Sequence, residues 1–236
     1  MVKPPTDVAD LNEGVTLVNV RKNFDKNLQE LQNKMNEMNE LTVAAFEKAF
    51  TAFKTQDVEL ALRVIDEDSA IDNLDQEINQ FAVWLIAKEQ PFATDLRRII
   101  ASLKITSDIE RIADFAVNIA KSTAKIGITE SLINITDLEQ MKEISLNMLK
   151  KAVSAFINGD MVLAKEVADL DDQVDNYYAE TYKKITEFLR THPEDTTQLV
   201  QLLFINRYLE RTADHITNIA ESAAYLIKGQ IYDLNQ

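Results

Sequence analysis

The chain has 236 residues, of which 46% are hydrophobic, so it is long enough to bury one large core or two modest ones. Its four glycines and four prolines are too few for the frequent turns of an all-β protein, and the lack of cysteine excludes disulfides and thiolate metal sites. The formal net charge of −14 argues against a general nucleic-acid binder or a binder of anionic membranes, because both need a basic surface. We therefore expect an all-α protein.

Two features argue against export and membrane insertion. Residues 1–14 are acidic and lack the apolar core of a signal peptide. The longest uninterrupted apolar run, residues 81–87, is far shorter than a bilayer span. The sequence therefore predicts a soluble, cytoplasmic protein with no direct membrane insertion.

The first half of the chain predicts three helices. Residues 1–21 show no sustained periodicity and are interpreted as an N-terminal arm, either flexible or a short added helix. From residue 22 apolar residues recur at alternating spacings of three and four, which is typical of a long helix in a bundle. A second helix over 57–89 should end before Pro91, because proline lacks an amide donor and disfavours helical geometry in the residue before it. A third helix over 92–125 completes a three-helix bundle that spans 22–127.

The second half repeats this plan after a short linker at 128–136. Its bundle spans 137–236, with helices expected at 137–158, 160–190 and 196–227. Glycine or the His192-Pro193 pair stands at each expected helix end. The fold class is thus a tandem repeat of two long three-helix bundles, with six helices in all.

A repeated motif supports the duplication. Residues 110–122 read ERIADFAVNIAKS and residues 210–222 read ERTADHITNIAES, 100 positions apart. Upstream, VIDEDSAIDN at 64–73 aligns with VADLDDQVDN at 167–176 at an offset of 103. The repeat keeps its carboxylates in place while its apolar residues drift, which draws attention to the carboxylates.

The acidic residues form pairs spaced four apart on the second and third helix of each bundle. They are Asp68, Asp72, Glu110 and Asp114 in the first bundle, and Asp171, Asp175, Glu210 and Asp214 in the second. Spacing of four puts both members of a pair on one helix face. In each antiparallel hairpin the two pairs are equidistant from the turn, so four carboxylates should lie at one level.

This arrangement predicts a cation site in each bundle. Asn118 and Asn218 continue the acidic stripe by one turn and offer a neutral oxygen. An oxygen-only set of ligands suits Mg²⁺, Mn²⁺, Ca²⁺ or iron. The alternative is a solvated acidic face in which Arg111 and Arg211 pair with acids of their own helix, but four pairs at matched heights favour the cation site.

Other candidate residues are interpreted as structural. His192 lies in a turn, and His215 should point about 100° away from the acidic stripe. Trp84 lies in an apolar run and is expected in the core. No phosphate loop, nucleophile elbow or zinc-protease signature is present, so no catalytic residue is predicted.

The motifs together resemble the PhoU family of phosphate-signalling proteins. The resemblance rests on the repeated E-R-x-A-D-x-x-x-N-I-A pattern, on QPFATDLRRI at residues 90–99, and on the D-x-x-x-D pairs, and it covers residues 22–230. It implies two related three-helix bundles, multinuclear metal clusters at the acidic pairs, and a regulatory role. The metal ions expected in such clusters are iron or zinc, with manganese or magnesium as alternatives.

The resemblance also implies partners. A family member restrains the phosphate-starvation response by acting between the ATPase subunit of the phosphate ABC transporter and a membrane sensor histidine kinase. We therefore expect a non-enzymatic negative regulator of phosphate uptake and signalling, a homodimer, with no nucleic-acid partner. The rival hypothesis is a metal-dependent phosphohydrolase that uses the carboxylate clusters.

The chain departs from the family pattern in two places. Residues 195–197 read DTT where the first bundle has DLR at 95–97, so any role of that element carries over to the first bundle alone. Tyr208 stands where the first bundle has Asp108, which predicts that the two clusters are unequal.

Overall fold

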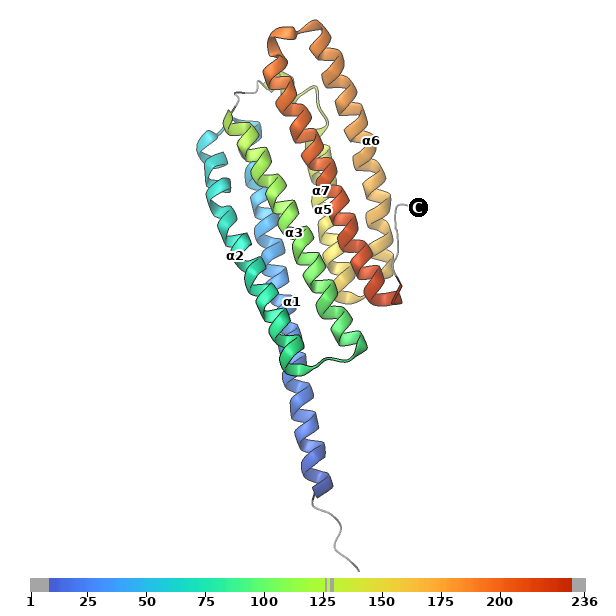
Figure 1. The fold of residues 1–236 in the computed structure, drawn as a ribbon. Helices are drawn as coiled ribbons and strands as arrows, with labels where there is room; N and C mark the ends of the chain where they lie inside the picture. Colours follow the sequence, from blue (N-terminus) through green and yellow to red (C-terminus); the bar gives the residue numbers. More distant parts are fainter. Residues whose placement is uncertain (1–8, 126, 128–129, 231–236) are drawn as a thin grey trace, which may run out of the picture.

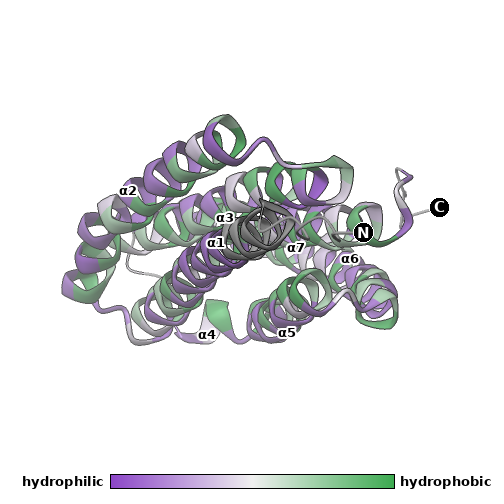
Figure 2. Ribbon diagram, turned by 90° about the horizontal axis from the view of Figure 1, so that it is seen from below, coloured by the Kyte–Doolittle hydropathy of each residue, from purple (hydrophilic) through white to green (hydrophobic). Residues whose placement is uncertain are grey.

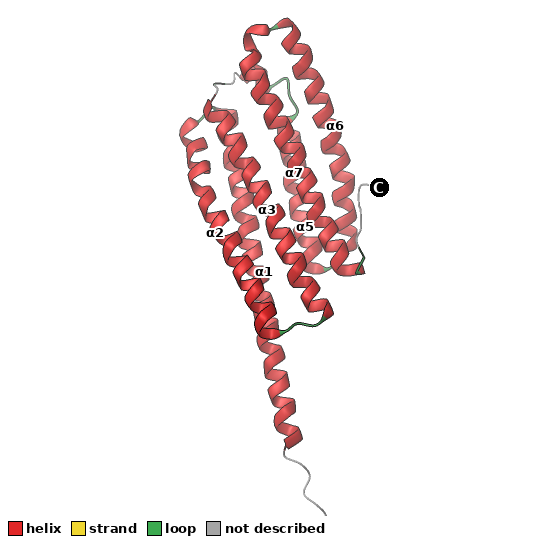
Figure 3. Ribbon diagram, in the orientation of Figure 1, coloured by secondary structure: helices red, strands yellow, loops and turns green. Residues whose placement is uncertain are grey.

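The structure, a computed structural model, describes the backbone of residues 9–125, 127 and 130–230, with side chains described from residue 22 onward. The described chain is helical and contains no strand (Figure 3). The first bundle consists of α1 (Ala9–Thr55), α2 (Val58–Glu89) and α3 (Ala93–Lys125). The second consists of α5 (Leu138–Asn158), α6 (Met161–Thr191) and α7 (Thr196–Lys228). The predicted all-α tandem repeat is confirmed.

Two short helices lie in the connections. The four-residue helix α4 (Glu130–Ile133) stands inside the predicted linker, and the 3-10 helix η1 (Pro193–Asp195) follows the end of α6. Within the described residues, none of the helices combines the length and apolar character needed to span a membrane.

The two bundles lie side by side and meet through α3 and α7 (Figure 1). Figure 2, seen along the helices, shows α1, α2 and α3 on one side and α5, α6 and α7 on the other. Each of the two central helices therefore packs on both of its own bundle's helices and on its counterpart in the other repeat.

The first helix begins earlier than the sequence predicts. Residues 9–21, which we assigned to a separate arm, continue α1 without a break, and Figure 1 shows α1 reaching beyond the body of the bundle. Residues 1–8 lie outside the described residues. The boundary at residue 22 is thus the point at which apolar periodicity begins, and the helix itself begins at Ala9.

The remaining helix ends follow local chemistry. The Asp57 carboxylate accepts a hydrogen bond from the amide of Leu60 at 2.9 Å and begins α2, and Asp160 caps α6 in the same way. The residue that follows α5 is Gly159, with φ of +66°, a left-handed conformation that glycine adopts without strain. The residue that follows α2 is Gln90, with φ of +45°, directly before Pro91.

The core is built from side chains at helical spacing on the inner faces. Phe46, Phe50 and Phe53 of α1 and Phe156 of α5 are among its largest fully buried members. Trp84 is a correction to the expected core: 42% of its surface is exposed, its ring stacks on Phe81, and the Lys88 ammonium lies 4.3 Å from the ring centre. The run of apolar residues at 81–87 is longer than one face of a helix, so part of it must face outward.

Candidate metal sites

The acids of α2 and α3 face each other and form the first acidic cluster, defined here as Asp68, Asp72, Asp75, Glu110 and Asp114. Burial raises the pKa of Asp68, and the nearby carboxylates of Asp72 and Asp114 raise that pKa further. Burial and then Asp114 raise the pKa of Glu110, while Arg111 opposes the rise. Asp72 and Asp75, on α2, also raise the pKa of Glu110. The hairpin therefore brings the acidic residues of both helices to one level, as the sequence predicted.

Asp75 is a member of this cluster that the sequence analysis missed. Its Oδ1 atom is buried and accepts no hydrogen bond, while its Oδ2 accepts one from Asn79 at 3.0 Å. Burial raises the pKa of Asp75, the hydrogen bond from Asn79 opposes the rise, and Asp72 adds to it. The signal was present in the sequence, because Asp75 follows Asp72 at a spacing of three, which also places two side chains on one helix face.

The second acidic cluster, defined as Asp171, Asp175, Glu210 and Asp214, lies between α6 and α7. Burial raises the pKa of Glu210, and Asp214 and Asp175 add to the rise against the opposing effect of Arg207. The pKa of Asp175 is raised by burial and by Asp214 across the hairpin. Asp171 is only 5% exposed. Both repeats thus hold half-buried carboxylates that repel one another.

Arginines neutralise the two clusters unequally. Arg111 contacts Asp114 at 3.0 Å and Glu110 at 3.5 Å, as the alternative of an ion-paired acidic face predicted. In the second cluster Arg207 contacts Glu210 Oε1 at 2.6 Å, and Arg211 places its guanidinium 5.4 Å from the ring centre of Phe115. The Oε2 atom of Glu210 remains buried without a hydrogen-bond partner. Each cluster therefore keeps a buried carboxylate oxygen that no donor satisfies, a costly arrangement unless something else pairs with it.

The donor set suits a hard cation, although the side chains do not converge on one point. Among the described residues, no group of three or more His, Asp or Glu side chains is arranged to hold a metal ion. The acids are spread along facing helices, so a shared ion would require rotation of exposed side chains such as Asp72 and Asp175. Oxygen-only ligands of this kind match the preferences of Mg²⁺, Mn²⁺ and iron.

The two asparagines predicted as ligands have different surroundings. Asn118 is half-buried on α3, one turn beyond Asp114. The amide of Asn218 points toward α3, where it donates a 3.4 Å hydrogen bond to Asp108. The structure therefore places the Asn218 amide at the contact between the repeats.

A contact between the repeats was not anticipated from the sequence. His215 Nδ1 lies 2.8 Å from Asp108 Oδ1, which joins α7 to α3. We expected Tyr208, in place of Asp108, to make the metal clusters unequal, but both residues lie at the α3–α7 contact, where Tyr208 stacks on Phe115. That expectation was wrong because position 108 falls on the side of α3 that faces α7.

Comparison with known proteins agrees with this architecture. The PhoU domain family model matches residues 35–123 and 138–223, one match in each bundle. A Clostridium acetobutylicum protein named phosphate-specific transport system accessory protein PhoU homolog is 33% identical over 216 residues, which are 91% of this chain and 99% of the relative. A homolog of the same name from Aquifex aeolicus is 37% identical over 206 residues, 87% of this chain and 93% of the relative.

Solved structures show the same arrangement of helices. The crystal structure of the phosphate transport system regulatory protein PhoU from Streptococcus pneumoniae superposes with a TM-score of 0.81 at 32% identity and covers 89% of this chain and 99% of that one. The structure of PhoU from Pseudomonas aeruginosa gives 0.83 at 28% identity, with 88% and 100% covered.

Proposed function

Because this chain belongs to the PhoU family, we propose that it is a negative regulator of phosphate uptake and phosphate-starvation signalling. Its relatives are named as accessory or regulatory proteins of phosphate transport. In the proposed role the protein is a cytoplasmic homodimer that acts as an adaptor between the ATPase subunit of the phosphate ABC transporter and a sensor histidine kinase.

The observation that carries the proposal is the pair of half-buried acidic clusters at matched positions in the two repeats. Like charges held on facing helices destabilise a bundle, and a buried carboxylate oxygen without a partner adds to that cost. A bound cation would remove both penalties. The proposed ligands are the acids of each cluster, with Asp75 Oδ1 and Glu210 Oε2 as the oxygens that lack another partner.

The bound ions would supply positive charge and hold α2 against α3 and α6 against α7. We propose a multinuclear site in each bundle, because four or five carboxylates exceed what one hard ion needs when several of them bind through both oxygens. The oxygen-only ligands favour iron, manganese or magnesium over zinc, which prefers nitrogen and sulfur. Elemental analysis of the purified protein identifies the native metal.

The positions of the two histidines favour a regulator over the rival phosphohydrolase. His215 contacts Asp108 at the contact between the repeats, and His192 stacks on Phe188 at the end of α6. Neither is placed as a general base for water at an acidic cluster. A protein that regulates without chemistry acts by binding one state of its partner better than another. The acidic face suits a basic partner surface, because opposed charges accelerate encounter and fix orientation.

The proposal is tested by genetic complementation. Deleting the gene should leave phosphate-starvation genes expressed in phosphate-rich medium, and the wild-type chain should restore repression. A variant with Asp68, Asp72, Glu110 and Asp114 changed to their amides should fold but restore repression poorly.

The matched control neutralises four exposed acids outside the clusters, with the changes Asp66→Asn, Glu143→Gln, Asp169→Asn and Glu180→Gln. This control should repress like the wild type. Full repression by the cluster variant would contradict the proposed role of the first acidic cluster. A deletion that leaves the starvation genes repressed would contradict the regulatory role itself.

A further inference from the structure

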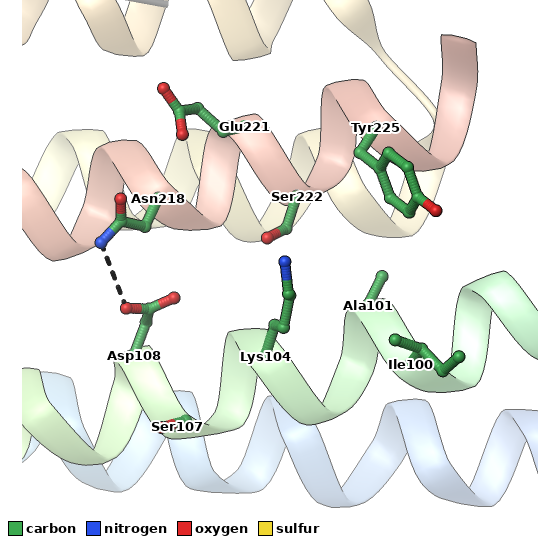
Figure 4. A pocket seen from close by; sticks show the side chains of 9 residues that line it. All are labelled: Ile100, Ala101, Lys104, Ser107, Asp108, Asn218, Glu221, Ser222 and Tyr225. Atoms are coloured by element: carbon green, nitrogen blue, oxygen red, sulfur yellow. Dashed lines mark hydrogen bonds between the residues drawn. The ribbon is translucent and has the colours of Figure 1, made fainter. Parts of the chain in front are cut away.

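A cavity of about 460 Å³ opens between α3 and α7, at the contact between the two repeats (Figure 4). It lies apart from the acidic faces of the two hairpins and is open to solvent on one side. Its polar lining comes from both helices, and the residues that matter here are Lys104, Asp108, Asn218, Glu221, Ser222 and Tyr225.

The internal duplication shows why the cavity exists. Positions on α3 and α7 correspond at an offset of 100, so the Asp108–His215 contact at one end of the interface corresponds to the Tyr208–Phe115 contact at the other. The rings of Tyr208 and Phe115 stack with their centres 6.0 Å apart, whereas Asp108 and His215 form a polar contact at 2.8 Å. One end of the interface is thus aromatic and the other is polar.

A second corresponding position enlarges this difference. Phe204 stacks on Tyr208 with ring centres 6.4 Å apart, and the residue that corresponds to Phe204 is Lys104. Lysine and aspartate therefore stand at the cavity where phenylalanine and tyrosine stand at the other end. The corresponding positions at the other end hold rings, with Phe204 itself 48% exposed, so a lysine and an aspartate at these positions are not a requirement of packing between the repeats.

The cavity has a cationic side. The Lys104 ammonium points across the cavity toward Ser222 of α7 (Figure 4), and Lys104 makes no ion pair with any described residue. Beyond it, the Tyr225 ring lines the cavity and carries the Arg97 guanidinium 5.5 Å from its centre. An ammonium with adjacent hydroxyl groups is a donor set for an anionic group that has several oxygens.

The other side of the cavity is an acceptor. Asp108 accepts hydrogen bonds from His215 and Asn218, whereas the Glu221 carboxylate of α7 points away from α3 (Figure 4). The Asp108 carboxylate repels a bare anion but accepts hydrogen bonds from hydroxyl groups. Beyond Lys104, on the side away from Asp108, the wall is apolar and is formed by Ile100 and Ala101.

We propose that this cavity binds a small phosphate ester of a hydroxyl-bearing sugar, of the size of a nucleoside monophosphate. The phosphate lies at Lys104 and Ser222, and the sugar hydroxyls donate to the Asp108 carboxylate. The inference does not depend on the proposed function, because it uses no residue of either acidic cluster.

The experiment is a titration of the full-length protein with four probes. Binding is measured by calorimetry and by NMR of amide-labelled protein. AMP and ribose 5-phosphate carry the proposed chemistry, whereas adenosine lacks the phosphate and inorganic phosphate lacks the sugar. We expect saturable binding of AMP or ribose 5-phosphate, with shifts at α3 and α7, and binding at least about tenfold weaker for the other two probes. Tighter binding of AMP than of ribose 5-phosphate shows that the base takes part. If neither phosphate ester binds, the proposal is overturned.

Two variants locate the site. Lys104→Ala should weaken binding about tenfold or more, because it removes the ammonium that contacts the phosphate. Its control, Lys125→Ala, removes a lysine from the position that corresponds to Tyr225 in the other repeat and should leave binding unchanged. Equal binding by wild type and Lys104→Ala overturns the proposed site.

A third variant fills the cavity with the protein's own alternative packing. The changes Lys104→Phe, Asp108→Tyr and His215→Phe reproduce the residues found at the other end of the interface. This variant should fold, with a helical circular dichroism spectrum like that of wild type, and should lose binding of the phosphate ester. Retained binding contradicts the assignment, and if the triple variant does not fold, the Lys104→Ala comparison decides the matter.

Discussion

Neutralising two acids of the first cluster should raise the stability of the metal-free protein and lower its response to metal. The variant is Glu110→Gln with Asp114→Asn. These side chains are 25% and 38% exposed, and they interact repulsively with each other and with Asp68, Asp72 and Asp75 of α2. Amides keep the shape of both side chains and remove their charge.

The magnitude follows from the repulsions and attractions that the two amides remove. Four repulsive pairs of carboxylates are relieved, namely Glu110 with Asp114, Asp72 and Asp75, and Asp114 with Asp68. At a few tenths of a kcal/mol each, their removal stabilises the fold by about 1 kcal/mol. The two ion pairs of Arg111, which is 57% exposed, disappear at the same time and cost about 0.5 kcal/mol together. The net gain is about 0.5 kcal/mol, which raises the melting temperature by about 1–2 °C in a chain of this length.

Metal should reverse the order of the two melting temperatures, so that the wild type melts above the variant. At a free ion concentration one hundred times its Kd, each occupied site adds about 2.7 kcal/mol, or roughly 5–10 °C in melting temperature. With the proposed metal binding, the wild type would have two such sites and the variant one. The assay is thermal unfolding by circular dichroism with EDTA and then with Mn²⁺, Fe²⁺, Mg²⁺ or Zn²⁺. The variant should melt higher than wild type in EDTA and lower in the metal that binds.

The control for this experiment is Asp66→Asn with Asp169→Asn, two exposed acids outside the clusters, which should gain as much from metal as wild type. The corresponding variant of the second cluster, Glu210→Gln with Asp214→Asn, should behave like the first-cluster variant. Equal gains by wild type and both cluster variants would contradict the proposed metal sites, as would a wild type whose melting curve no metal shifts.

Three further predictions concern stability. The pKa values of five cluster carboxyls are raised, so the repulsion among these groups is fully present above their folded-state pKa and is relieved as pH falls toward the ordinary values of 3.8 or 4.5. The melting temperature of the metal-free protein should therefore rise between pH 7 and mildly acidic pH. This gain should outweigh the opposite effect of Glu139, whose pKa is lowered. In a urea titration, Gly159→Ala should lower the free energy of unfolding by about 1 kcal/mol. The loss comes from backbone strain alone, because nothing lies within 4 Å of the added Cβ. Gly127→Ala should leave the free energy of unfolding unchanged. Phe156 is 1% exposed, and Phe156→Ala should lower the free energy of unfolding by about 3–5 kcal/mol in calorimetry. Phe92 is 86% exposed, and Phe92→Ala should lower it by less than about 0.5 kcal/mol. Similar losses for the two variants would contradict the assigned core.

The helices of the two bundles could be predicted closely because local chemistry sets their ends. The end of α2 before Pro91 and the end of α6 before Pro193 follow from the missing proline amide, and both lie within a residue or two of the expected positions. The facing of the acidic pairs could be predicted too, since residues equidistant from a tight antiparallel turn must lie at one level. The start of α1 could not, because residues 9–21 carry no apolar periodicity to distinguish them from an arm.

Contacts between the repeats could not be predicted from periodicity. A helix packed on three neighbours is apolar over most of its circumference, so the pattern of α3 does not reveal which side meets α7. Asp108 and Tyr208 were therefore assigned to the acidic side, whereas both lie at the interface. Comparing the two repeats position by position would have marked residues 108 and 215, since a polar pair there replaces an aromatic pair.

In the proposed role the protein links phosphate transport to signalling through its acidic face. The most direct test of this role is affinity purification of the tagged full-length chain from phosphate-replete cells, with bound proteins identified by mass spectrometry. The wild-type chain should recover the transporter's ATPase subunit and the sensor histidine kinase. The variant with Asp68, Asp72, Glu110 and Asp114 changed to amides should recover less of them than the off-cluster control. Recovery of neither protein by the wild-type chain would contradict the adaptor role.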